Sequence, residues 1–258
     1  MVDVKPLLAT HHLAVEIGGK RVCRDLALAV HAGECWGMLG VNGVGKTTLL
    51  HTLAGLKPAS DGEIRIEGRP LASMRRKEAG RRIGLLPQTH EDPFPSSVLE
   101  TALIGRHPYL GRLEWESAGD EAIARGALAA VGLEGAEARL AHTLSGGERR
   151  LLALATLLTQ DPPLYLLDEP SNHLDLHQQI AVLDLLKAKT RAGRAIVMVL
   201  HDVNLAARYC DRALLLHGEG ESEQGGTKEI LTETTLSRLY RHRVDLLQAG
   251  ERRIFIPG

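Results

Sequence analysis

Residues 40–47 constrain this chain of 258 residues more than any other segment. Their sequence, Gly-Val-Asn-Gly-Val-Gly-Lys-Thr, fits the phosphate-binding pattern G-x-x-x-x-G-K-[ST]. An apolar strand expected at 35–39 precedes the loop, and apolar residues at helical spacing follow it over 47–56. In this setting backbone N–H groups and a helix N-terminus bind phosphate. The alternative, a Gly-rich turn with an incidental Gly-Lys-Thr, does not explain the flanking pattern.

The loop predicts a set of nucleotide contacts. Lys46 is expected to reach the β- and γ-phosphates of the nucleotide, and the Thr47 hydroxyl to bind Mg²⁺. The residues expected to contact the nucleotide are Gly40, Asn42, Gly43, Gly45, Lys46, Thr47 and Thr48.

Two acidic residues end a second apolar strand, expected at 164–167. Asp168 and Glu169 are adjacent, and adjacent strand residues point to opposite faces. A shared site therefore needs a bend, and Pro170 supplies an interruption because it cannot extend a ladder. The alternative is a solvated acidic pair leaving the strand. The nearby phosphate loop favours a role in nucleotide chemistry.

A third segment, Ser145-Gly146-Gly147-Glu148, opens an expected helix at 147–159. Ser is a preferred N-cap, so a simple capped helix is one interpretation. Gly146 and Gly147 are poor helix formers, each costing about 1 kcal/mol relative to Ala in a helix interior. Close approach to an anion explains them better.

Leu144–Glu148, the phosphate loop and the acidic strand end together resemble the ATP-binding subunits of ABC transporters. The resemblance covers nearly the whole chain. It implies an α/β fold with a P-loop NTPase core, whose sheet is mixed but mainly parallel, an N-terminal antiparallel β part and a helical ABC subdomain. Residues 1–258 then form a single ABC ATPase domain. Residues 1–87 and 162–258 form its RecA-like catalytic core, and residues 88–161 form the helical subdomain.

The resemblance also implies roles for single residues. Asp168 holds Mg²⁺ through water, Glu169 polarises the attacking water, and His201 contacts the γ-phosphate and steadies Glu169. Gln88 senses the metal and the γ-phosphate and links to the membrane subunits. The implied catalytic residues are thus Glu169, His201 and Gln88, and the implied metal residues are Thr47, Gln88 and Asp168.

In the resembled family, each nucleotide is shared between two subunits. The segment formed by Ser145, Gly146, Gly147 and Glu148 contacts the γ-phosphate of the ATP held by the partner. Residues 171–175 cross the dimer interface, and Asp175 also caps the next helix. A second copy of the chain is therefore an expected partner.

The chain departs from the family pattern at two places. Ile17 stands where many relatives stack adenine on an aromatic residue, and only 3% of the chain is aromatic. This predicts modest ATP affinity and poor discrimination against GTP. Arg150 and Leu151 stand where relatives usually carry Gln and then Arg, so the contact made by that Arg is an open question.

Residues 104–108 and 201–209 resemble importers of iron–siderophore, haem and cobalamin. The expected function is ATP hydrolysis by a head-to-tail dimer that powers import of a metal chelate, iron–siderophore or cobalamin ahead of haem. The alternative is a soluble ABC-type ATPase of an iron–sulfur cluster assembly complex. The expected partners are permease subunits and, indirectly, a periplasmic or surface solute-binding protein.

Composition narrows the location and the partners. The formal net charge of −1 gives no strong basic field for nucleic acid, so no nucleic-acid partner is expected. No apolar run approaches the roughly 18–20 residues needed to span a bilayer. The three Cys form no C-x-x-C pair. We expect a peripheral protein at the cytoplasmic face of the inner membrane.

The remaining pattern predicts secondary structure. Strands are expected at 7–17, 22–30, 63–67, 83–87, 195–200 and 212–216, and helices at 71–81, 117–131, 176–191, 203–209 and 234–240, with a final hairpin turning at 249–250.

Overall fold

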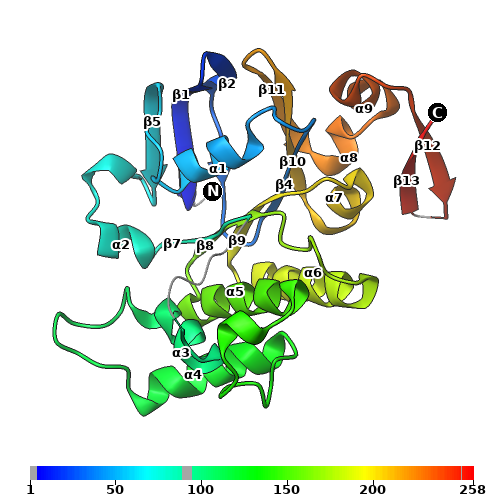
Figure 1. Ribbon diagram of the computed structural model, residues 1–258. Coiled ribbons are helices and arrows are strands. Elements are labelled where there is room, and N and C mark those ends of the chain that lie inside the picture. Colours follow the sequence, from blue (N-terminus) through cyan, green and yellow to red (C-terminus); the bar gives the residue numbers. More distant parts are fainter. Residues whose placement is uncertain (1–4, 89–94, 251) are drawn as a thin grey trace.

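A six-stranded sheet forms the centre of the molecule (Figure 1). A computed structural model describes residues 5–88, 95–250 and 252–258. The strand order is β11-β10-β4-β9-β8-β7, and every neighbouring pair is parallel except β10 with β11. The strands are β4 (Cys35–Gly40), β7 (Ile83–Leu86), β8 (Leu164–Asp168), β9 (Ala195–Val199), β10 (Arg212–Gly218) and β11 (Glu221–Gly226). All residues of β4, β8 and β9 are buried, as expected for parallel strands covered on both faces.

An antiparallel sheet packs beside the central one and has the order β2-β1-β5-β6, with β3 paired to β1. Its strands are β1 (Leu8–Ile17), β2 (Lys20–Leu26), β3 (Ala29–Val30), β5 (Asp61–Ile66) and β6 (Arg69–Pro70). The single strand expected at 22–30 is therefore wrong. β2 ends at Leu26 and β3 begins at Ala29, and the two strands pair with different ends of β1, residues 13–17 and residues 8–9. Asp25, with φ 54°, marks an irregularity within β2 where its register with β1 shifts.

Helices cover both faces of the central sheet. They are α1 (Lys46–Leu53), α2 (Arg76–Gly80), α3 (Val98–Leu103), α4 (Ala118–Ala130), α5 (Gly146–Gln160), α6 (Leu176–Arg191), α7 (Val203–Tyr209), α8 (Thr227–Ile230) and α9 (Glu233–Tyr240), with 3₁₀ turns at Leu71–Ser73, Ile104–Arg106 and Ala141–Thr143. In Figure 1, α3, α4 and α5 lie together below the sheet. The division into a core and a helical subdomain at 88 and 161 stays a prediction, and residues 89–94 lie outside the described part of the chain.

The helix expected at 71–81 is interrupted. A 3₁₀ turn, Leu71–Ser73, is followed by Met74 and Arg75 in extended conformation before α2 begins. The Ser73 hydroxyl donates to the Pro70 carbonyl at 2.7 Å and closes the turn locally. Such side-chain bonds compete with continuation of a helix.

Two hydrophobic cores share the central sheet. Along β8, Leu164 and Leu166 belong to the core around α1 and the antiparallel sheet. Tyr165 and Leu167 belong to the core around α5, α6 and α7. This alternation is the strand period of two, with both faces apolar because both are covered.

The chain ends in a hairpin of β12 (Val244–Ala249) and β13 (Arg252–Pro257), as predicted. Asn204 of α7 holds the hairpin through two bonds to the Phe255 backbone. Its side-chain amide donates to the Phe255 carbonyl at 3.1 Å and its side-chain oxygen accepts from the Phe255 N–H at 2.7 Å. Within the described ranges, no helix has the length and apolar character needed to cross a membrane.

Candidate functional site

The carboxyl ends of four neighbouring parallel strands place the predicted residues at one rim of the sheet. Gly40 ends β4, Gln88 follows β7, Asp168 ends β8 and His201 follows β9. In parallel α/β sheets the loops at these ends meet, which is why ligands bind there. Residues distant in sequence therefore converge at this edge.

Glycine at position 45 is required by the fold of the phosphate loop. Gly45 has φ 111°, and a Cβ there would lie 2.5 Å from Cγ2 of Val22. It stands at the N-cap of α1 with no side-chain cap and no acidic residue in the first turn of the helix. The backbone donors and the positive end of α1 therefore face the loop, and no acidic side chain of the first turn neutralises them.

Lys46 projects back into the loop. Its Nζ donates to the carbonyls of Gly40 at 2.7 Å and Val41 at 3.1 Å, and the residue is buried. Burial lowers the pKa of Lys46, and the nearby charges of Glu169 and Asp168 act against that shift. A lysine in this position supplies a positive charge that phosphate oxygens can use.

Asp168 is fully buried, and both of its carboxylate oxygens lack a hydrogen-bond partner among the described residues. Burial raises the pKa of Asp168, and the Thr47 hydroxyl is the main group acting against that rise. A buried carboxylate without a partner is costly unless a cation completes its surroundings. Asp168 and Thr47 thus lie together as oxygen donors for a hard cation.

Three polar side chains converge on the carboxylate of Glu169. Gln88 Nε2 donates to Oε2 at 3.2 Å, Asn172 Nδ2 donates to the same oxygen, and His201 Nε2 bonds to Oε1. The Glu169 side chain is 7% exposed, whereas that of His201 is 41% exposed. The predicted catalytic residues are therefore in direct contact around one carboxylate.

The bend that redirects the acidic pair occurs at Glu169 itself, one residue before the predicted interruption at Pro170. Glu169 has φ 53°, in the left-handed region that non-glycine residues seldom adopt. This conformation turns its carboxylate toward the loop while Asp168 stays in the strand.

Sequence analysis missed Asn172 as a neighbour of the catalytic carboxylate. Its N–H donates to the Glu169 carbonyl at 3.1 Å, which closes a turn over 169–172. An Asn three residues beyond a strand-ending Glu, with Pro between them, is the available signal, because such turns bring the first and fourth side chains together.

A cavity of about 410 Å³ opens over these groups. It is lined by Ile17, Asn42, Gly43, Gly45, Lys46, Thr47, Thr48, Gln88, Glu169 and His201. Gly40 and Asp168 are not among the residues that line this cavity. Ile17, 43% exposed, sits at the cavity where an aromatic ring was expected in relatives.

The segment Ser145–Glu148 lies elsewhere. Ser145 caps α5, accepting from the Glu148 N–H at 3.2 Å, while Glu148 accepts from the Ser145 N–H at 2.8 Å. A hydrogen bond from Arg139, joined by the Ser145 N–H, lowers the pKa of Glu148 to about 2. A Cβ on Gly147 would meet the His173 carbonyl at 3.2 Å, whereas one on Gly146 would meet open space. No residue of this segment lines the 410 Å³ cavity of the same chain.

A phosphate loop, a buried acidic strand end, and a carboxylate contacted by Gln, Asn and His at the rim of a parallel sheet define a nucleoside triphosphatase of the P-loop class. A model of the ABC transporter family matches residues 23–172, more than half of the chain. The chain belongs to the ABC transporter family, as its ATP-hydrolysing, ATP-binding component.

Individual relatives cover nearly all of the chain. It is 40% identical to the hemin import ATP-binding protein of Streptomyces coelicolor, over 93% of this chain and 85% of that protein. It is 37% identical to a petrobactin import ATP-binding protein of Bacillus anthracis, over 91% of this chain and 86% of that protein. A solved structure described as a metal-chelate type ABC transporter, in an inward-facing conformation, superposes with a TM-score of 0.85 at 28% identity, covering 97% of this chain and 96% of that one.

Proposed function

We propose that two copies of this chain bind two ATP molecules head to tail and, by hydrolysing them, drive import of a metal chelate through a membrane permease. The main support is that the two sets of nucleotide-binding residues lie apart in a single chain. Lys46, Glu169 and His201 surround one cavity, whereas Ser145–Glu148 present a capped helix end away from it. A second copy can supply that helix end, because helix N-termini favour anionic phosphate.

Within each site the residues divide the chemistry. Lys46 and the donors at the N-terminus of α1 bind the phosphates and neutralise charge that develops during transfer. Glu169, held by Gln88, Asn172 and His201, orients and polarises the attacking water. His201 steadies the carboxylate and reaches the γ-phosphate from the exposed side of the cavity.

Mg²⁺ fits the oxygen donors of Asp168 and Thr47. Asp168 has unpartnered buried oxygens and the Thr47 hydroxyl lies beside it. Gln88, through its side-chain oxygen, completes the proposed metal set. Within the described ranges, no group of three or more His, Cys, Asp and Glu could hold a metal by itself, so a bound Mg²⁺ would also need oxygens from the nucleotide and from water. The ion supplies charge neutralisation for the phosphates.

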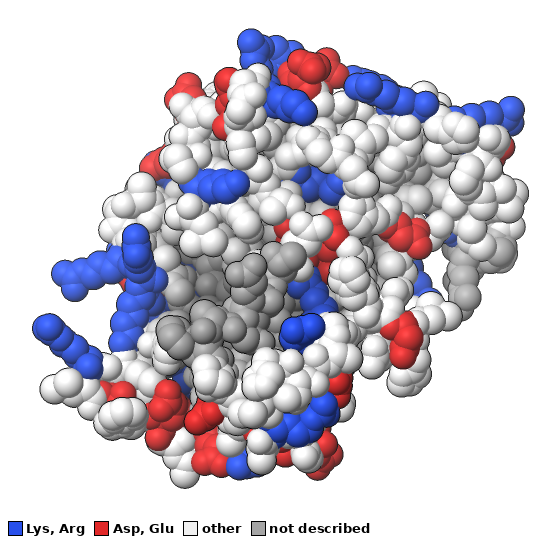
Figure 2. Space-filling view, in the orientation of Figure 1, with Lys and Arg blue, Asp and Glu red and all other residues white. Residues whose placement is uncertain are grey.

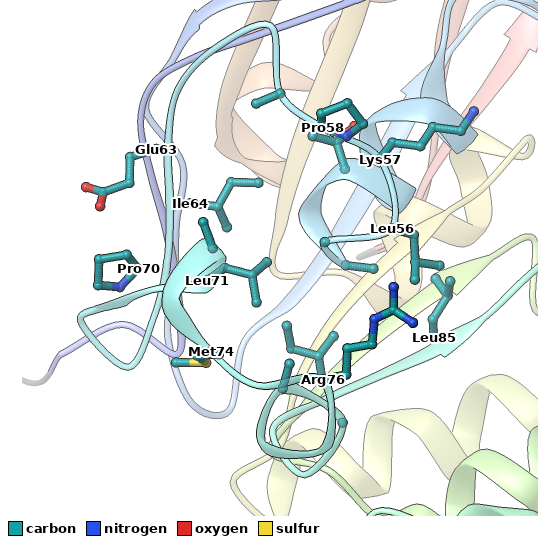
Figure 3. Close-up of a pocket in the computed structure, with 18 of the residues that line it drawn as sticks. Leu56, Lys57, Pro58, Glu63, Ile64, Pro70, Leu71, Met74, Arg76 and Leu85 are labelled. Atoms are coloured by element: carbon teal, nitrogen blue, oxygen red, sulfur yellow. The ribbon is translucent and has the colours of Figure 1, made fainter.

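A groove that β7 lines offers a place for the permease. It has a volume of about 810 Å³, and Figure 3 shows Leu56 and Pro58 on one side and Leu71 and Met74 on another. Leu85 of β7 lines it, three residues before Gln88. A permease segment seated there contacts the strand that Gln88 follows.

The groove is bordered by positive charge. Lys57 and Arg76 line it, together with the carboxylate of Glu63, and Figure 3 shows all three side chains. In Figure 2, Lys and Arg side chains project from the edge at which Figure 1 places α2. Its positive side chains favour contact with a negatively charged permease loop or with a negatively charged membrane surface beside that loop. It supports a peripheral position at the cytoplasmic face of the inner membrane.

The cargo is proposed as an iron chelate, haem or an iron–siderophore, with cobalamin as a further metal chelate. The named relatives import hemin and petrobactin, so they do not support ranking haem last. They also do not favour the alternative of a soluble iron–sulfur assembly ATPase.

The test is reconstitution of the ATPase with its co-purifying permease and solute-binding protein in liposomes. ATP hydrolysis should rise severalfold with one loaded chelate among hemin, an iron–siderophore and cobalamin. Absence of any permease after detergent extraction of membranes, with full ATPase activity in the soluble fraction, contradicts the proposal.

A further inference from the structure

Arg150 of α5 places a buried guanidinium between two strand ends of the catalytic site. The residue is 7% exposed. Its Nη1 donates to the carbonyl of Pro87 and, at 3.3 Å, to that of Gln88. Its Nη2 donates to the carbonyl of Asp168 and, at 2.9 Å, to that of Glu169. The guanidinium therefore joins the end of β7 to the end of β8.

The geometry uses what is particular to arginine. A guanidinium is planar and presents its N–H donors in a fixed fork, so two pairs of carbonyls can be held at a set separation. A lysine ammonium is a point donor and cannot span both pairs. Burial lowers the pKa of Arg150, with the charges of Asp168 and Glu169 acting against it, so the charge is costly to hold at this position. An uncharged side chain of similar shape costs less if only packing is needed.

The bonded carbonyls belong to the residues whose side chains meet. Gln88 and Glu169 are joined by the side-chain bond of 3.2 Å, and Arg150 holds the backbone of both. Glu169 also has the left-handed backbone, φ 53°, which is strained for a residue with a Cβ. Its carbonyl accepts from Arg150 and from the Asn172 N–H, and together these bonds favour that conformation.

We propose that Arg150 is a positioning residue for Glu169, holding its strained backbone and the backbone of Gln88 so that the carboxylate faces the phosphate loop. This inference rests on the catalytic role proposed above for Glu169. Arg150 lies three residues after Gly147 on the same helix. The helix whose first turn is proposed to meet the partner's nucleotide therefore also contacts the Glu169 carbonyl, through Arg150. The chain carries this arginine where the family resemblance predicts glutamine.

The test uses Arg150→Gln, Arg150→Lys and, as matched control, Arg149→Gln, in the full chain bound to its permease. Arg149 is exposed on the same helix. We expect Arg150→Gln to lower kcat about tenfold or more while the dissociation constant for ATP stays within about twofold, because Lys46 and the loop are untouched. Arg150→Lys should retain an intermediate kcat, and Arg149→Gln should match the parent.

A double variant tests the role of Arg150 separately from the role of Glu169. If Arg150 acts through Glu169, adding Arg150→Gln to Glu169→Gln should lower kcat no further. Loss of turnover in Glu169→Gln with a normal kcat in Arg150→Gln overturns the role of Arg150 alone. Normal turnover in Glu169→Gln overturns the proposed role of Glu169.

Thermal unfolding shows whether Arg150 only stabilises the fold. A fall in melting temperature with unchanged kcat per folded molecule overturns the proposal. So does unfolding of both Arg150 variants at the assay temperature while Arg149→Gln stays folded.

Discussion

The side-chain amide of Gln88 donates to the carboxylate of Glu169 at 3.2 Å, across 81 residues of sequence. One residue follows β7 and the other follows β8, which are paired neighbours in the sheet. The bond therefore connects the end of β7 with the candidate catalytic carboxylate at the end of β8. It places the carboxylate in contact with the residue that we propose to sense the nucleotide and to link to the permease.

Glu169→Gln should retain ATP binding and lose turnover by about 10²–10⁴-fold, the usual contribution of a positioned general base. The amide keeps the shape of the side chain and removes its charge and basicity. Steady-state hydrolysis and nucleotide titration measure the two effects, and size-exclusion chromatography with ATP should show accumulation of a closed dimer. Unchanged hydrolysis excludes Glu169 from the chemical step.

Ile17→Tyr should tighten ATP binding by about 1 kcal/mol, or roughly fivefold, because it supplies a stacking face at the cavity. Selectivity for ATP over GTP should also rise, since the parent chain offers only an aliphatic side chain there. Competition binding with both nucleotides provides the measurement. Ile123→Tyr, at an Ile that is 44% exposed on α4, is the matched control and should change neither affinity. Tight, adenine-selective binding by the parent chain contradicts the expectation.

Gly45→Ala should weaken ATP binding and destabilise the chain by about 1–3 kcal/mol, the cost of a strained backbone conformation. The new methyl group meets Val22 as well as a φ of 111°. Gly126→Ala is the control. Its methyl group meets open space within α4, and it should stabilise the chain by about 0.5–1 kcal/mol. Urea unfolding of both variants gives the comparison, and equal stability of the two refutes the steric argument.

Asp161 should make stability depend on pH in the acid range. Burial acts to raise the pKa of Asp161, but bonds from Arg194, Lys189 and Tyr165 outweigh it and hold the pKa at about 2. The folded pKa is thus below the unfolded value near 3.9. The stabilisation of the folded chain by the bonds to ionised Asp161 is therefore present above about pH 4 and is lost as the pH falls toward 2.

Asp161→Asn is the corresponding variant. The Asp161 side chain is 35% exposed, so solvent screening limits the expected loss of unfolding free energy in the variant at pH 7 to about 1 kcal/mol. Chemical denaturation at pH 7 and pH 3 should show a smaller difference between variant and parent at the lower pH. A constant difference across that range rejects the titration of Asp161 as its cause.

Much of the fold follows from local pattern. The bounds of α6 and α7 agree with the helices expected at 176–191 and 203–209, because an Asp N-cap and a helical apolar stripe define each one. The polar edge strand β11, Glu221–Gly226, was missed because it has no apolar alternation. It is held by pairing with β10, which no local pattern reveals.

The candidate site also has features that the sequence predicts and features that it does not. The loop, Gln88, Glu169 and His201 were predicted from motifs at strand ends, and the structure brings their side chains to one cavity. The left-handed backbone of Glu169 and the buried reach of Arg150 were missed. Both depend on contacts between β7, β8 and α5 in three dimensions, and an Arg on a helix has no sequence signal that separates a solvated side chain from a buried one.

The side chains of β8 alternate between the two hydrophobic cores, so this strand links the unfolding of one core to that of the other. Leu166 packs into one core and Leu167 into the other, and Leu154 of α5 belongs to the same core as Leu167. Neither face of this strand can lose its cover without exposing a shared backbone to water. The sheet-bearing and helix-rich parts of the chain are therefore one folding unit, and calorimetry should record a single melting transition for both.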